Sequence, residues 1–149
     1  MKNFYLFILL FILFGCKTNI LDRKTVSIIE CPPIFFSKEH KVYIHSKFED
    51  ISLDNISYKA EINNAVFNKK CKIINGKFSN KISILFLVNP LINTQEDISL
   101  PFYIALIDEQ KNIQNIEYFF ANDPFKKNLE TNTFVETEVT ITKNINFEL

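Results

Sequence analysis

Short runs of β-branched and aromatic residues, each bounded by Asn, Asp or Pro, occupy almost the whole chain after residue 24. Such runs are typical of β-strands. Outside the N-terminal segment, no window of about 12 residues has the i, i+3, i+4, i+7 apolar spacing of an amphipathic helix. The chain is therefore expected to be all-β, with strands at residues 25–31, 40–46, 56–67, 69–74, 77–89, 100–107, 113–121 and 134–147.

The order of these strands favours antiparallel pairing. Residues 56–62 and 135–141 alternate between apolar and polar side chains, as strands do when one face lies in a core and the other in water. A polar loop over 108–112 joins two expected strands as a hairpin. Because only short turns and no helical crossovers separate the strands, the pattern predicts an antiparallel β-sandwich of about seven or eight strands.

The dipeptide Asn75-Gly76 lies between two apolar runs and is the preferred sequence of a type I′ hairpin turn. A two-residue loop pairs Ile74 with Lys77. The same register, carried along both strands, pairs Phe67 with Ile84. Apolar residues then meet apolar residues over most of the hairpin, which supports this register.

The N-terminus has the features of an export signal. Lys2 precedes an unbroken apolar run over residues 4–14, which as a helix would span roughly half of a bilayer core and is too short to cross it. The run ends in Leu13-Phe14-Gly15-Cys16, which looks like a bacterial lipobox. We expect a lipoprotein signal peptide with a helical core at 1–15, a lipidated Cys16 with a short tether at 16–24, and a β-sandwich domain at 25–149. An ordinary export signal is the alternative.

The lipid on Cys16 would hold the protein on a membrane, because two or more acyl chains anchor stably where one does not. The tether over 17–24 reaches at most about 28 Å, which keeps the domain near the membrane surface. Lys17 follows the cysteine, where Asp is the inner-membrane retention signal of many Gram-negative lipoproteins. The expected location is therefore the bacterial envelope, at the outer membrane and facing the periplasm.

Cys31 and Cys71 are the two remaining cysteines. An even pair in an oxidising compartment predicts a disulfide, and the hairpin register places Cys71 on the core-facing side. A metal site with His40 and His45 is the competing interpretation, but the chain has no CxxC motif. A free, reactive Cys71 among lysines is a further alternative. We expect no metal and no cofactor.

Several motifs resemble a family of small, uncharacterised alphaproteobacterial lipoproteins. After the lipobox, the similar elements are Cys31-Pro32, Ala60-Glu61-Ile62, Cys71 and the run Pro-Phe-Tyr-Ile-Ala-Leu-Ile-Asp over 101–108. Many members have Gly in the turn that follows the Asp, where this chain has Asn112. The resemblance implies an envelope lipoprotein with an immunoglobulin-like or fibronectin type III-like domain. It supplies no activity, so no catalytic residue is carried over.

Composition and motifs narrow the function classes. The net charge is zero, so the chain lacks the excess of basic residues that is typical of nucleic-acid binders. Gly occurs only at Gly15 and Gly76, which excludes Gly-rich phosphate loops. No GxSxG or HExxH motif is present, so we expect no enzyme, with a hydrolase as a distant third hypothesis.

Two functions remain. The first is a non-catalytic structural or protein-interaction module that docks another envelope protein. The second is a periplasmic domain that binds a small ligand or lipid in the space between its sheets. A large apolar cavity would favour the second, whereas a filled core with an apolar outer patch would favour the first.

A candidate patch follows from two strands that are apolar on both faces. In 82–88 and 100–107, one set of alternate residues must face away from the core. The outward set is expected to include Leu85, Leu87, Tyr103 and Ile107, which would mark a protein or lipid contact. A covering of this face by the Pro-flanked loop over 121–128 is the simpler explanation, to which the exposed contact patch is the alternative.

Overall fold

The computed structural model describes residues 25–48, 52, 54–92 and 97–149. Its strands are β1 (Val26–Ile29), β2 (Val42–Ser46), β3 (Ile56–Phe67), β4 (Cys71–Ile74), β5 (Lys77–Pro90), β6 (Ile98–Ile107), β7 (Ile113–Asp123), β8 (Lys127–Asn128), β9 (Thr133–Phe134) and β10 (Thr137–Glu148). This described part contains no helix, and each strand pair is antiparallel. The all-β prediction is confirmed, whereas the predicted signal helix and tether lie outside the described residues.

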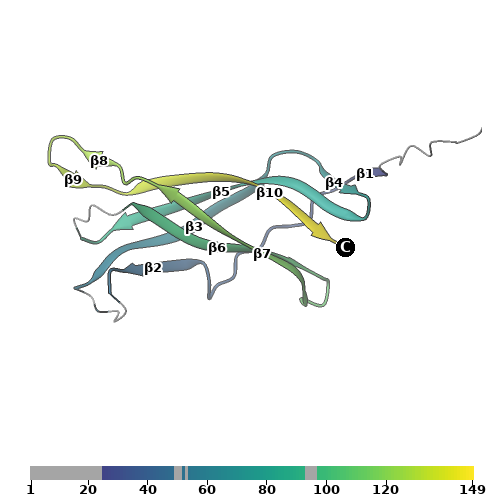
Figure 1. The fold of residues 1–149 in the computed structure, drawn as a ribbon, viewed down its shortest axis with the longest axis horizontal. Coiled ribbons are helices and arrows are strands. Elements are labelled where there is room, and N and C mark those ends of the chain that lie inside the picture. Colours follow the sequence, from purple (N-terminus) through teal and green to yellow (C-terminus); the bar gives the residue numbers. More distant parts are fainter. Residues whose placement is uncertain (1–24, 49–51, 53, 93–96) are drawn as a thin grey trace, which may run out of the picture.

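The long strand β5 is the centre of the larger sheet (Figure 1). One of its edges pairs first with β4 and then with β3, which continues to β2, while β1 extends the sheet beyond β4. Its other edge pairs with β10 from Lys77 to Val88. Alternate β5 residues are buried, from Phe78 through Ile84 to Val88, so this strand forms the floor of the core along its length.

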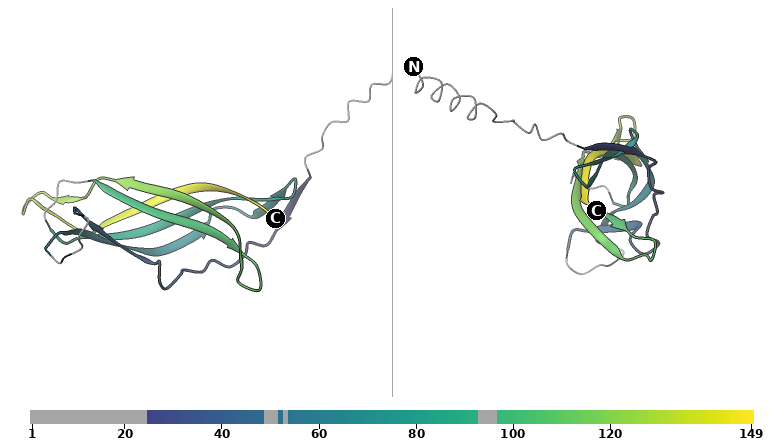
Figure 2. Two further views of the ribbon diagram at one scale, coloured as in Figure 1. Left: turned by 60° about the horizontal axis from the view of Figure 1, so that its bottom comes forward. Right: turned by 90° about the vertical axis from the view of Figure 1, so that its right-hand side faces the viewer.

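The hairpin of β6 and β7 forms a second sheet that packs against the first. The Phe86 ring in β5 meets the Phe102 ring in β6, with centroids 5.3 Å apart. On the side of β10, the Lys143 ammonium lies over the Phe119 ring of β7, 5.8 Å from its centroid. In the end-on view of Figure 2, the strands curve around a shared interior.

The turn at Asn75-Gly76 has the geometry that the sequence predicts. Both residues have positive φ, 51° and 78°, as a type I′ turn requires, and Ile74 pairs with Lys77. The predicted register is wrong farther along, because Phe67 pairs with Ile82 instead of Ile84.

This shift arises between β3 and β4. The amide of Asn68 donates to the carbonyl of Lys81, 2.8 Å away, and Lys72 pairs with Ser79. Residues 69–71 therefore lie opposite Asn80 alone. The Asn80 side-chain amide donates to the Lys69 carbonyl over 3.1 Å, which satisfies a polar group that would otherwise be unpaired beside the core. Since the slip is two residues, each side chain keeps its predicted face.

A second irregularity divides β3 itself. Ile62 pairs with Phe86 and Asn64 with Leu85, so Asn63 is an extra residue on β3. Such a bulge exchanges the inward and outward faces of a strand. It allows Ile62 and Ala65, which are three apart, both to pack against the core.

The β6–β7 turn is held by Asp108. Its carboxylate accepts hydrogen bonds from the Asn112 amide, over 2.8 Å, and from the Gln114 side chain, over 2.7 Å. These bonds, that from the Asn112 backbone first, hold the pKa of Asp108 below its usual range. The residue of this turn with positive φ is Lys111, at 68°.

The segment between β7 and β10 differs from the prediction. The last long strand begins at Thr137, not at residue 134, because β8 and β9 form a short hairpin before it. Phe125 in the preceding loop is buried against Tyr58, with ring centroids 5.5 Å apart. The loop over 121–128 thus covers one end of the core and leaves Tyr103 and Ile107 36% and 42% exposed.

Candidate functional site

Cys31 and Cys71 form the predicted disulfide, which closes a sequence separation of 40 residues. Cys71 is fully buried on the core side of β4, as the hairpin pattern predicts, while Cys31 is half-buried after β1. The Asn80 amide lies 2.6 Å from the Cys71 sulfur. The bond therefore fastens the segment after β1 to the wall of the core.

Residues 32–41 run from this disulfide to β2, and we refer to them as the strap. The strap contains no strand, and Pro32-Pro33 at its start offers no amide hydrogens for a ladder. Its far end is held at Lys41, whose carbonyl accepts the Ile62 amide over 3.1 Å and whose ammonium pairs with Glu61 over 2.7 Å. The hydrogen bond from the Lys41 ammonium holds the pKa of the Glu61 carboxyl below its usual range.

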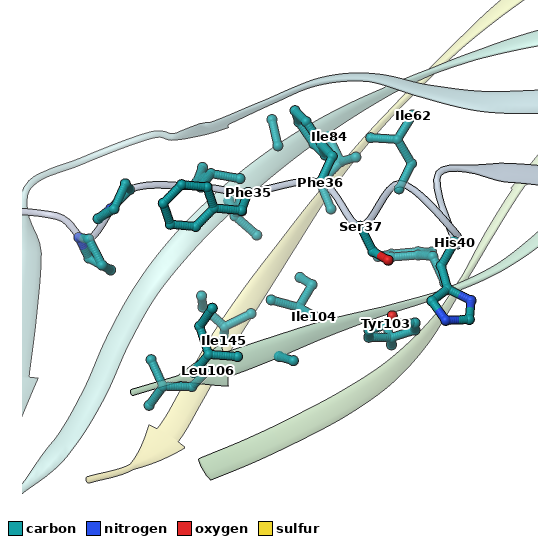
Figure 3. Close-up of a pocket in the computed structure, with 18 of the residues that line it drawn as sticks. Phe35, Phe36, Ser37, His40, Ile62, Ile84, Tyr103, Ile104, Leu106 and Ile145 are labelled. Atoms are coloured by element: carbon teal, nitrogen blue, oxygen red, sulfur yellow. The ribbon is translucent and has the colours of Figure 1, made fainter. Parts of the chain in front are cut away.

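A cavity of about 380 Å³ lies between the two sheets and beside the strap (Figure 3). Its lining combines core side chains from both sheets with the strap itself. The lining residues are Pro32, Pro33, Ile34, Phe35, Phe36, Ser37, His40, Lys41, Ile62, Ala65, Phe67, Phe78, Ile82, Ile84, Phe102, Tyr103, Ile104, Ala105, Leu106, Ile107, Ile113, Ile145 and Phe147. The wall is thus overwhelmingly aliphatic and aromatic.

The polar groups of the cavity gather at one end. In Figure 3, Ser37, His40 and Tyr103 lie together, away from Ile145 and Leu106. The His40 and Tyr103 rings meet edge to face, with centroids 5.8 Å apart. This contact joins the strap to β6.

A second part of the interior, around Tyr58, does not line the cavity. Tyr58 is fully buried, and its hydroxyl donates to the Ser99 carbonyl over 2.9 Å and accepts the Ser99 amide over 3.1 Å. His45 stacks on the Tyr58 ring, with centroids 4.6 Å apart. Burial raises the pKa of the neighbouring Tyr43. No group of three or more His, Cys, Asp or Glu residues suited to a metal ion occurs in the described part of the chain.

The four residues of the candidate patch do not lie on one sheet. Leu85 and Leu87 face outward on β5 and are half-buried among polar cross-strand neighbours, such as Thr140 and Glu138 on β10. Tyr103 and Ile107 belong to β6, which pairs only with β7 among the described strands. Since β5 and β6 are not neighbours, the predicted patch divides into two.

A larger apolar face is present on the β6–β7 hairpin. Cross-strand pairs that point away from the core are apolar on both strands, and they include the Tyr103–Tyr118 pair, whose ring centroids are 6.1 Å apart. The members of this hairpin face are Pro101, Tyr103, Ala105, Ile107, Ile113, Ile116, Tyr118 and Phe120, of which Tyr103, Ala105, Ile107 and Ile113 also line the cavity. Tyr118 is 74% exposed. In the sequence, Ile116, Tyr118 and Phe120 recur at a spacing of two, which is the signal for this face once β7 is known to pair with β6.

Comparisons with protein-family models, with curated proteins and with solved structures give no match to this chain. Cys16, the predicted lipidation site, lies outside the described residues. None of the described segments is a helix with the length and apolar character needed to cross a membrane. The cavity, the strap and the hairpin face are therefore the features on which a function can be based.

Proposed function

We propose that this protein is a lipid-anchored envelope protein that binds an apolar small molecule or a lipid between its sheets. The observation that carries the proposal is the cavity of about 380 Å³ with a mostly apolar wall. Ligand pockets are commonly about 300–1,000 Å³ and apolar, with a few placed polar groups. A closely packed core would leave no such space.

The proposal takes the two packed sheets as an antiparallel sandwich. The shared core supports this arrangement, since Phe86 of one sheet contacts Phe102 of the other. The immunoglobulin-like or fibronectin type III-like type of sandwich stays a prediction. The proposed anchor is the lipid on Cys16, and the proposed location is the periplasmic side of the outer membrane.

We assign no catalysis to this site. The described cavity wall contains no Asp, Glu or Cys side chain, so it offers neither a carboxylate pair nor a nucleophilic thiol. What the wall does offer is a large apolar surface, which favours binding of a nonpolar molecule by removal of both surfaces from water.

Photolabelling of the full chain in its own membranes tests this proposal. An uncharged alkyl probe that carries a diazirine should label peptides from β3, β5 and β6 in the wild type. Ala65→Phe fills the cavity, because Ala65 lines it, and should reduce this labelling about tenfold or more, as expected for the loss of a good apolar site. Ile104→Phe repeats the block from the opposite wall.

Val66→Phe is the matched control, because Val66 is the next residue of β3 and is exposed on the other face. It should label as the wild type does. Equal labelling of wild type, Ala65→Phe and Ile104→Phe, with all three proteins folded by their thermal transitions, would contradict the proposal. Absence of adducts on the cavity strands of the wild type would contradict it as well.

The hairpin face supports a second candidate, a module that docks another protein of the envelope. Its eight residues include Tyr and Phe and no charged side chain. Aromatic residues are enriched and charges are depleted in the core of protein–protein interfaces, whereas contact with an anionic bilayer would use basic residues. The face therefore fits a protein partner better than a membrane.

A photo-crosslinking amino acid in place of Tyr118 tests this candidate in cells. It should give a discrete covalent product with a second protein. The same amino acid in place of Asn146, an exposed residue of β10, should give no such product. Tyr118→Lys should remove the association while it changes the free energy of unfolding by no more than about 0.5 kcal/mol. Products that contain only lipid, or only a second copy of this chain, would contradict it.

A further inference from the structure

The size of the cavity limits what it can hold. At about 380 Å³, it is near the lower end of the range of ligand pockets, roughly 300–1,000 Å³. A molecule with two long acyl chains and a large head group would exceed this space. One unbranched chain with a small head group fits the volume better.

The wall of the cavity is amphipathic along its length. Figure 3 shows Ser37, His40 and Tyr103 at one end, with aliphatic residues such as Leu106 and Ile145 at the other. In the described part of the chain, the Ser37 hydroxyl, the His40 ring nitrogens and the Tyr103 hydroxyl make no hydrogen bond to another residue. They are therefore available to a ligand that is polar at one end only.

The charged side chain of the cavity wall is basic. Lys41 also lines the cavity, and no acidic side chain does so among the described residues. Glu61 pairs with Lys41 but is not part of the lining. The Lys41 ammonium only donates, and the hydroxyl and imidazole groups can donate as well as accept, so the wall matches an oxyanion better than a cation.

We infer that the ligand is a single-chain fatty acid whose carboxylate lies at the Ser37–His40–Tyr103 end of the cavity and whose alkyl chain lies among the aliphatic residues. This inference rests on the proposed ligand-binding function and names its ligand class. The strap contributes the head-group contacts through Ser37 and His40, while the sheets contribute the surface for the chain.

The test uses the full chain in its own membranes and two diazirine probes of equal chain length, a fatty acid and the corresponding fatty alcohol. The acid should label the cavity strands about tenfold more than the alcohol, and unlabelled decanoate should compete better than decanol. The double variant Ser37→Ala/His40→Ala should reduce labelling by the acid about tenfold, the effect of losing charge-assisted hydrogen bonds, and leave labelling by the alcohol unchanged.

Glu39→Ala is the matched control, since Glu39 lies in the same exposed strap segment but does not line the cavity. Tyr103→Phe removes the hydroxyl alone and should give a smaller loss with the acid only. Equal labelling by acid and alcohol, or no effect of the double variant, would overturn the fatty-acid inference and leave the proposed function standing. Stronger competition by a lysophospholipid than by decanoate would also overturn it. Failure of both probes to label the wild-type cavity would instead refute the proposed function.

Discussion

The two halves of the interior are built from the same strands but are closed in different ways. In one half, Tyr58, Val88 and Leu100 are almost wholly buried and do not line the cavity. In the other half, Phe67 and Ile104 are only half-buried and border the cavity. We refer to these as the filled half and the hollow half.

The difference lies in what covers each half. Over the filled half, the Tyr58 hydroxyl exchanges two hydrogen bonds with Ser99 of the other sheet, and Phe125 closes the end. Over the hollow half, the cover is the strap, which is fastened at Cys31 and Lys41 and has no ladder between them. Hydrogen bonds between the sheets accompany the filled half, and a cover whose backbone is fastened only near its ends accompanies the cavity.

The largest expected effect is that of Tyr58→Ala in the filled half. Removal of a fully buried aromatic ring costs about 3–5 kcal/mol in the free energy of unfolding, because a cavity remains and Ser99 loses its partner. Phe67→Ala in the hollow half should cost clearly less, since that ring is half-buried beside existing space.

Urea unfolding of the two variants measures this difference. Their m-values should equal that of the wild type, which would show that all three proteins undergo the same unfolding transition. Equal losses of stability in Tyr58→Ala and Phe67→Ala would show that the filled half and the hollow half do not differ in packing.

The disulfide is expected to have the next largest effect. Cys31→Ala/Cys71→Ala should lower the free energy of unfolding by roughly 4 kcal/mol in the chain-entropy model, given the 40-residue separation. Release of one end of the strap should also reduce probe labelling of the hollow half. The Tyr58–Ser99 contact of the filled half should persist.

Thermal unfolding and the photolabelling assay together check this prediction, and the wild type treated with a reductant should behave as the double variant does. A loss of stability with undiminished labelling would separate the disulfide from the cavity and show that the strap needs only its Lys41 end.

The smallest expected effect gives the sharpest contrast between the halves. Ala60 and Ala65 are both on β3 and both contact the core, but only Ala65 lines the cavity. Ala60→Leu should lower the free energy of unfolding by about 1–3 kcal/mol through overpacking. Ala65→Leu should leave it nearly unchanged, because the added carbons enter empty space. Differential scanning calorimetry can resolve the pair, and a destabilisation by Ala65→Leu as large as that by Ala60→Leu would show that the cavity cannot accept added atoms.

Local patterns were sufficient to predict most of the longer strands, the type I′ turn at Asn75-Gly76 and the disulfide partners, but not the short strands β8 and β9. These features depend on neighbouring residues or on cysteine number, which the sequence states directly. The predicted register was correct beside the turn and wrong at Phe67, because residues 69–71, where β3 passes into β4, lie opposite Asn80 alone. Bulges add residues to one strand without a reliable composition signal.

The cavity could not be predicted from these patterns. Its walls consist of residues, such as Ile84 and Ile104, that a filled core would use equally well. Periodicity tells which face of a strand is inward, but it does not tell whether the inward side chains meet. The hairpin face was partly predicted through Tyr103 and Ile107, and the rest depended on knowing that β7 is the neighbour of β6.

The pairing of β10 with β5 has a consequence for incomplete chains. Residues 82–88 of β5 read Ile-Ser-Ile-Leu-Phe-Leu-Val, without charge, Pro or Gly, and β10 covers one backbone edge of this stretch. A chain cut before Thr137 would present that edge as an open template, rich in aliphatic and aromatic side chains, of the kind that seeds cross-β aggregation. β10 thus shields a segment that is prone to self-association, and nascent or proteolysed forms of this protein should depend on chaperones until residues 137–148 are in place.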